Sequence, residues 1–145
     1  MSKSRTTRID GLDKLTKDLE KFAKEAVPPL GRVAHHGAES IRIRAKAKVN
    51  NVSGDLARSL RVKDSKLSSN KLYVGSYVTW GDDVRDYAAP LELGHNVKNV
   101  KDGPVIGHVK ARPFLRPAAD ESKRNIKKWM IEAINKQIEK LGVDI

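Results

Sequence analysis

Residues 60–79 of the chain read LRVKDSKLSSNKLYVGSYVT, and this stretch decides the class of fold. Apolar and polar side chains alternate over 59–63 and again over 72–79, with the turn-like sequence DSKLSSNK between the two runs. A period of two residues is typical of a strand that buries one face, and two such runs joined by a turn form a hairpin. We therefore expect an antiparallel β-hairpin near the centre of the chain.

Helical patterns lie before this hairpin. Apolar residues recur at spacings of three and four over 9–26, which predicts an amphipathic helix. Pro28 and Pro29 lack the backbone N–H that a helix interior needs, so we expect them to end this helix. A second stripe predicts a helix over about 30–49. Its small residues would let another element approach closely, and they are Ala34, Gly37, Ala38, Ala45 and Ala47.

A last helical stripe runs from Phe114 to Leu141. Pro117 fits only in the first turn of a helix, which sets the start near Arg116. Residues 94–110 show no clear period, so we expect a long loop in which 105–109 can supply a third strand.

The predicted fold class is therefore α+β, with long helices packed on a small antiparallel β-sheet in the order α-α-β-β-(β)-α. At 145 residues we expect a single domain over 1–145 with a polar N-terminal arm over 1–8.

The composition is strongly basic. The chain has 29 Lys and Arg against 18 Asp and Glu, for a net charge of +11, which predicts affinity for polyanions. The cations are spread along the chain and aromatic residues are only 5%, so no platform for stacking bases stands out. The sequence has no cysteine, no signal-peptide pattern and no long apolar run, so we expect neither disulfides, nor export, nor contact with a membrane.

The sequence has none of the phosphate-loop, dinucleotide or helical zinc motifs. His35 and His36 are neighbours, so on a helix they point about 100° apart and cannot bind one metal ion together. His95 and His108 have only scattered acids nearby. We expect no enzyme activity, catalytic residue, cofactor or metal.

Asp82, Asp83 and Asp86 form an acidic island in this basic chain. Their position after Gly81 is typical of a helix N-cap or a solvated turn. As an alternative, a like copy could dock a basic surface there in a head-to-tail contact, which closes into a ring if the rotation allows.

Three short segments follow one another in order: SGDLARSL over 53–60, YAAPLELGH over 87–95 and ARPFLRPA over 111–118. Together they resemble the signature of the tailed-bacteriophage tail-completion family, also described as neck or head–tail joining proteins. The positions that carry this resemblance are Gly54, Leu56, Arg58, Tyr87, Ala88, Glu92, Gly94, Arg112, Pro113, Phe114, Arg116 and Pro117. Leu93 and His95 stand where Phe and Thr are more usual in that family.

The resemblance implies a structural virion protein that completes the tail, or joins the tail to the head, as a ring of subunits. Its partners would be copies of itself, the head-connector proteins and the tail-tube or terminator proteins, and the free protein would be either a ring or a monomer. It would be located in the virion, at the tail or the head–tail interface, after assembly in the host cytoplasm. The alternative is a basic nucleic-acid-binding module, and DNA passing through a ring would combine the two.

Physical roles can be assigned to the same segments. Gly54 is expected to turn the chain from helix to strand, with Asp55 as a local cap. Core packing is expected of three residues, Tyr87, Phe114 and Leu115. Structural or intersubunit ion pairs are expected of three charged residues, Glu92, Arg112 and Arg116.

Overall fold

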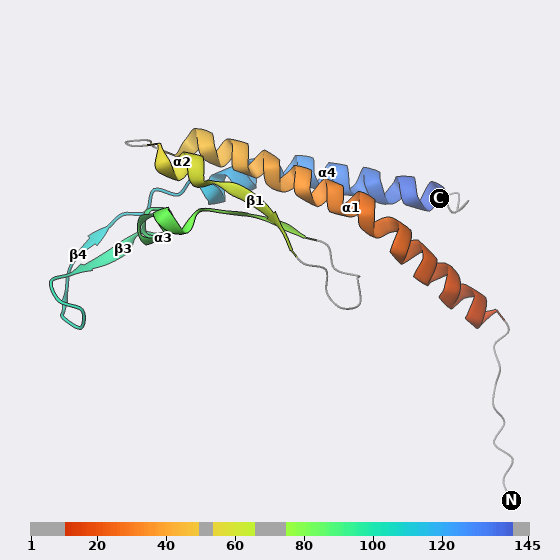
Figure 1. The fold of residues 1–145 in the computed structure, drawn as a ribbon, viewed down its shortest axis with the longest axis horizontal. Coiled ribbons are helices and arrows are strands. Elements are labelled where there is room, and N and C mark those ends of the chain that lie inside the picture. The colour runs from red at the N-terminus through yellow and green to blue at the C-terminus, as the bar shows by residue number, and fades with distance from the viewer. Residues whose placement is uncertain (1–10, 50–53, 66–74, 141–145) are drawn as a thin grey trace, which may run out of the picture.

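The structure is a computed structural model that describes residues 11–49, 54–65 and 75–140 (Figure 1). Its elements are α1 (Leu12–Lys48), α2 (Asp55–Ser59), β1 (Arg61–Asp64), β2 (Ser76–Thr79), the 3₁₀ turn η1 (Asp82–Val84), α3 (Arg85–Leu93), β3 (His95–Lys98), β4 (Val105–Val109) and α4 (Leu115–Glu139). The fold is α+β, as predicted, with two small antiparallel sheets. The predicted arm over 1–8 lies outside the described residues.

α1 is one continuous helix of 37 residues, so the prediction that Pro28 and Pro29 end a first helix is wrong. The two prolines cannot donate to the carbonyls of Lys24 and Glu25. Both of these residues are exposed, so water can satisfy their carbonyls. Figure 1 shows the helix axis bending along its length, so that the N-terminal part of α1 leads away from the rest of the molecule.

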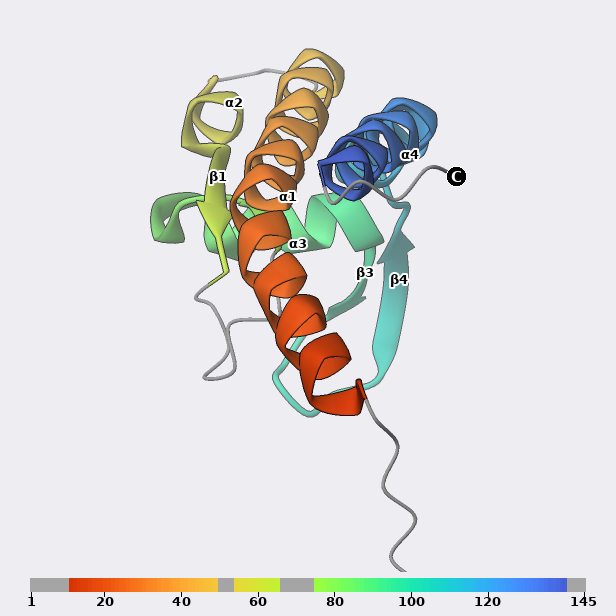
Figure 2. The same ribbon diagram turned by 90° about the vertical axis from the view of Figure 1, so that its right-hand side faces the viewer.

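α4 lies antiparallel along α1 (Figure 2). Near one end of the contact, Lys48 Nζ is 2.6 Å from Glu121 Oε1. Further along, a Cβ atom at Gly37 would come within 3.1 Å of Ile126, so α1 and α4 are in close contact there. The small residues of α1 allow this approach as predicted; those that are buried are Ala34, Gly37, Ala38 and Ala45.

β1 and β2 form the antiparallel hairpin that the alternating pattern predicts. Val62 pairs with Val78, and both are partly buried, while Arg61 and Lys63 are exposed. α1 packs against both strands, so the apolar face of this hairpin lies against the long helix. Residues 72–74 of the predicted second strand lie outside the described residues.

The prediction of a long loop over 94–110 is wrong, because β3 and β4 form a second antiparallel hairpin there. The predicted third strand is confirmed as β4, but its partner is β3 and it joins neither β1 nor β2. Every residue of both strands is exposed and the register shifts between Val97 and Lys98. Because neither strand has a buried face and their register is not constant, apolar and polar residues do not alternate along them.

The α4 helix begins at Leu115, so Pro117 lies in its first turn as predicted. The short helices α2 and α3 were not predicted, because α2 has only five residues and α3 contains Pro90. None of the described helices is long and apolar enough to cross a membrane.

Candidate functional site

The three sequence segments that carry the family resemblance meet in one hydrophobic core. Its buried members are Ala45, Val49, Leu56, Ala57, Leu60, Val84, Ala88, Phe114 and Ala118. Phe114 is only 1% exposed, which confirms its predicted place in the core, and Leu115 packs partly buried against it. The apolar residues of the segments therefore build one structural unit.

Glu92 of α3 holds the start of α4. Its Oε2 atom accepts the backbone N–H of Phe114 at 2.7 Å and that of Leu115 at 3.0 Å, and its Oε1 atom accepts the N–H of Arg116 at 3.0 Å. These N–H groups belong to the first turn, where a helix offers no carbonyl partner and favours a negative charge. The structure thus gives Glu92 a helix-capping role, whereas its predicted structural or intersubunit ion pair stays a prediction. The backbone N–H of Arg112 donates to the Leu91 carbonyl at 2.8 Å beside it.

Two glycines of the segments have backbone angles that other residues rarely adopt. Gly94 ends α3 with φ 73° and ψ 167°, and a Cβ there would lie 2.8 Å from the Val109 carbonyl oxygen. Gly54, with φ 79°, is the N-cap of α2, so it leads into a short helix and not directly into a strand as predicted. Asp55 lies in the first turn of α2 and pairs with Arg58.

A cleft of about 750 Å³ lies between α3 and the β3–β4 hairpin. We call it the α3–hairpin groove, and its lining residues are Asp86, Tyr87, Pro90, Leu91, His95, Val109, Lys110 and Arg112. Tyr87 is 44% exposed, so the prediction that it packs in the core is wrong. Partial loss of hydration, followed by the charges of Asp55 and Asp83, raises the pKa of Tyr87.

The three aspartates predicted as an acidic patch lie in three different surroundings. Asp82 Oδ1 is 2.8 Å from the Arg85 guanidinium. Asp83 lines a polar cleft of about 400 Å³ with Arg58 and Arg61 among its other residues. Asp86 lies in the α3–hairpin groove with Lys110 and Arg112. The structure therefore distributes these acids among cations, and the N-cap position of η1 is Gly81, which has no side chain to make a cap hydrogen bond.

Large apolar side chains are exposed along much of the molecule, including Ile43, Tyr77, Leu93, Ile131 and Ile134, and two groups of them lie in the parts of the fold that project from the body. One is the N-terminal part of α1, where Leu12, Leu15 and Leu19 are 53–58% exposed. The other is the β3–β4 hairpin with its connecting turn, where the exposed residues are Val97, Val100, Val105, Ile106 and Val109. Figure 1 shows these regions at opposite ends of an elongated molecule. The sequence pattern identifies the leucine stripe, but not that it is left uncovered.

The histidines of α1 point in different directions, as predicted. His35 Nδ1 is 2.9 Å from Asp64 Oδ1, whereas the ring of His36 lies 4.6 Å from that of Trp129. Hydrogen bonds from Ser76 and then from His35 lower the pKa of the Asp64 carboxyl. Within the described ranges, no group of three or more His, Asp or Glu side chains could hold a metal ion.

No model of a known protein family, no curated protein and no solved structure matches this chain.

Proposed function

We propose that this chain is a structural assembly protein that completes a phage tail, or joins the tail to the head, as one subunit of a ring. The observation that carries the proposal is the exposure of large apolar side chains at both ends of an elongated molecule. Exposed apolar side chains that lie together on one surface mark interaction sites in soluble proteins. A protein whose two ends both require a partner is suited to being a subunit of a larger assembly.

The position of these surfaces favours a ring. Two different surfaces at opposite ends cannot meet within one copy, but each can meet the other surface on a neighbouring copy. Such head-to-tail contacts close into a ring when the rotation between subunits allows it. This supports the expectation of a ring of subunits in contact with head-connector and tail-tube or terminator proteins, in the virion.

The three segments that resemble the tail-completion family support the same proposal. They lie in separate parts of the sequence, yet their apolar residues share one core and Glu92 of the second segment caps the helix of the third. The segments therefore specify one rigid body with the N-terminal part of α1 and the β3–β4 hairpin projecting from it. We propose no catalytic role for these residues, no cofactor and no metal.

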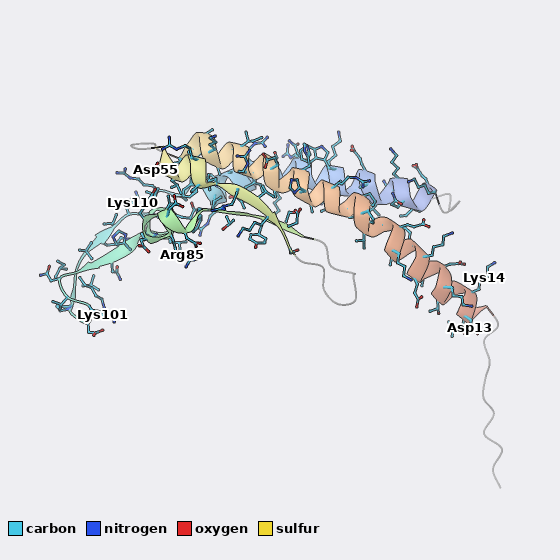
Figure 3. The ribbon with its side chains drawn as sticks, viewed as in Figure 1. Asp13, Lys14, Asp55, Arg85, Lys101 and Lys110 are labelled. Carbon is cyan, nitrogen blue, oxygen red and sulfur yellow. The ribbon has the colours of Figure 1, made fainter. Side chains whose placement is uncertain are left out.

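A second candidate function is non-specific binding of nucleic acid. The exposed β3–β4 hairpin and its flanks carry Lys98, Lys101, Lys110 and Arg112 against the single acid Asp102. Figure 3 shows Lys101 and Lys110 on this projecting end. A two-stranded ribbon fits the major groove of DNA, and cations on it would contact phosphates. In a ring, the same surface could face DNA.

Light scattering on the purified protein, at low and moderate salt and with or without duplex DNA, tests the proposal. A discrete ring-sized species, or a monomer indifferent to DNA at moderate salt, supports an assembly protein. A DNA complex that survives moderate salt would instead favour the nucleic-acid module. The affinity of such a module for DNA should fall as salt rises, by about 0.9 log units per phosphate contact for each tenfold rise in salt concentration.

A further inference from the structure

The leucine stripe of α1 continues the face that α4 covers elsewhere. Leu12, Leu15 and Leu19 recur at spacings of three and four, and the same helix buries Ala34 and Gly37 further along. α4 runs antiparallel, and its last described residue is Lys140, whereas the N-terminal part of α1 leads away from the body (Figure 1). An isolated helical segment of this length is only marginally stable in water, so a partner on its apolar face would stabilise it.

The charges around the stripe favour a basic partner. At 100° per residue, Asp18 lies about 90° from the centre of the stripe and is the charged residue closest to it. Lys17, Lys21 and Lys24 lie about 140–180° away, on the back of the helix. A surface that covers the leucines would therefore meet a carboxylate at its edge before it meets a lysine.

One face of the β3–β4 hairpin, which we call the apolar face, carries Val97 and Val109, whereas Ile106 lies on the other face with Asn96 and His108. The register pairs His95 with Val109 and Val97 with Gly107, which puts these four residues on one face. On the opposite face, His108 Nδ1 is 3.0 Å from Asn96 Oδ1. The apolar face continues into the α3–hairpin groove, because His95 and Val109 also line the groove.

Gly107 makes this face suitable for a helix. Among the described residues, a Cβ at Gly107 would meet only Val97, at 3.9 Å, so the centre of the face is flat and open. A glycine inside a strand often marks a place where another backbone approaches closely. The five residues of β4 span about 16 Å, which accommodates the rise of about 10 Å between Leu12 and Leu19.

We propose that the N-terminal part of α1 of one copy docks into the α3–hairpin groove of the next copy. Leu12, Leu15 and Leu19 would cover the apolar face of the hairpin, and Asp18 would lie near Lys110 or Arg112 at the groove. This inference rests on the proposed function and specifies its subunit contact. Because the two surfaces lie at opposite ends of the molecule (Figures 1 and 3), the contact is head-to-tail and repeats from copy to copy.

Cysteine cross-linking tests this contact directly, because the natural chain contains no cysteine. A Leu15→Cys copy and a Val109→Cys copy, carrying different tags, are mixed under mild oxidation. Both positions are exposed, at 55% and 45%, so neither change should disturb folding. The matched control replaces Leu15→Cys by Lys17→Cys, which lies on the back of the same helix. We expect roughly tenfold more mixed disulfide from the Leu15 variant, because docking raises the local concentration of its partner.

Equal yields from the Leu15 and Lys17 variants would overturn the proposal, as would a product dominated by Val109→Cys homodimers, which would indicate hairpin-to-hairpin pairing. Light scattering on the Leu15→Glu variant separates this inference from the proposed function. A Leu15→Glu protein that still forms the ring would refute the groove contact and leave the assembly function standing. If the unaltered protein forms no ring and instead binds DNA at moderate salt, the proposed function itself is wrong.

Discussion

The carboxylate of Glu92 accepts the backbone N–H of Phe114 at 2.7 Å, which couples the end of α3 to the start of α4. Phe114 is the largest fully buried side chain of the described residues, so this hydrogen bond also helps to position the largest side chain in the core. One acidic side chain thereby determines both the first turn of a helix and the position of an aromatic ring.

Glu92→Ala should lower the free energy of unfolding by about 2–3 kcal/mol, because it leaves the N–H groups of the first turn of α4 without their acceptor. Glu92→Gln keeps an acceptor oxygen but loses the negative charge at the helix N-terminus, and should cost about 1 kcal/mol. Urea unfolding measures both. As a control, Glu132→Ala on the exposed face of α4 should change stability by less than about 0.5 kcal/mol. A Glu92→Ala protein as stable as this control would contradict the capping role.

Gly94→Ala should cost at least about 2 kcal/mol, because φ 73° with ψ 167° is a conformation essentially restricted to glycine. The added Cβ would also meet the Val109 carbonyl oxygen at 2.8 Å and the Ala111 nitrogen at 2.9 Å. Gly11→Ala is the matched control, since Gly11 also has a positive φ, of 94°, but open space around it. It should cost only about 1 kcal/mol, so equal losses in thermal unfolding would show that the close approach of β4 is unimportant.

Gly37→Val should destabilise the protein by roughly 1–3 kcal/mol, because Ile126 already lies 3.1–3.3 Å from where a Cβ would be. Ile126→Ala in the same chain should recover part of this loss by making room. A double-mutant cycle measured by urea unfolding should therefore give a coupling of about 0.5–3 kcal/mol. Ala47→Val on the exposed side of α1 supplies the control for helix propensity alone. An additive result would mean that α1 and α4 do not touch at Gly37.

Asp64 should titrate below its ordinary pKa of 3.8, because Ser76 Oγ donates to Oδ1 at 2.6 Å and His35 lies 2.9 Å from the same atom. A carboxyl whose pKa is lowered by folding stabilises the folded state above its unfolded pKa, and that stability is lost as the pH falls through the folded value. NMR titration of the side-chain carboxyl measures the pKa. Ser76→Ala should raise it more than His35→Ala does, and an unchanged pKa in Ser76→Ala would contradict the hydrogen bond as its main cause.

The sequence alone determined the elements whose side-chain pattern has one clear buried face. Val62 and Val78 are recognisable as a strand pair because apolar and polar residues alternate around them, and the small residues around Gly37 predict close packing before any partner is known. Pro117 likewise sets the start of α4, because proline fits a helix only in its first turn. Each of these is a local constraint that acts within a few residues.

Only the tertiary structure decided which faces are covered and by what. The helix continues through Pro28 because exposed carbonyls nearby can bind water and because α1 packs along α4. Neither condition can be inferred from the sequence around Pro28. The capping of α4 by Glu92 joins residues that lie 22–24 positions apart. The exposure of Leu15 and Val109 has the same origin: a periodic pattern shows which side chains share a face, whereas packing between distant segments determines whether that face is buried.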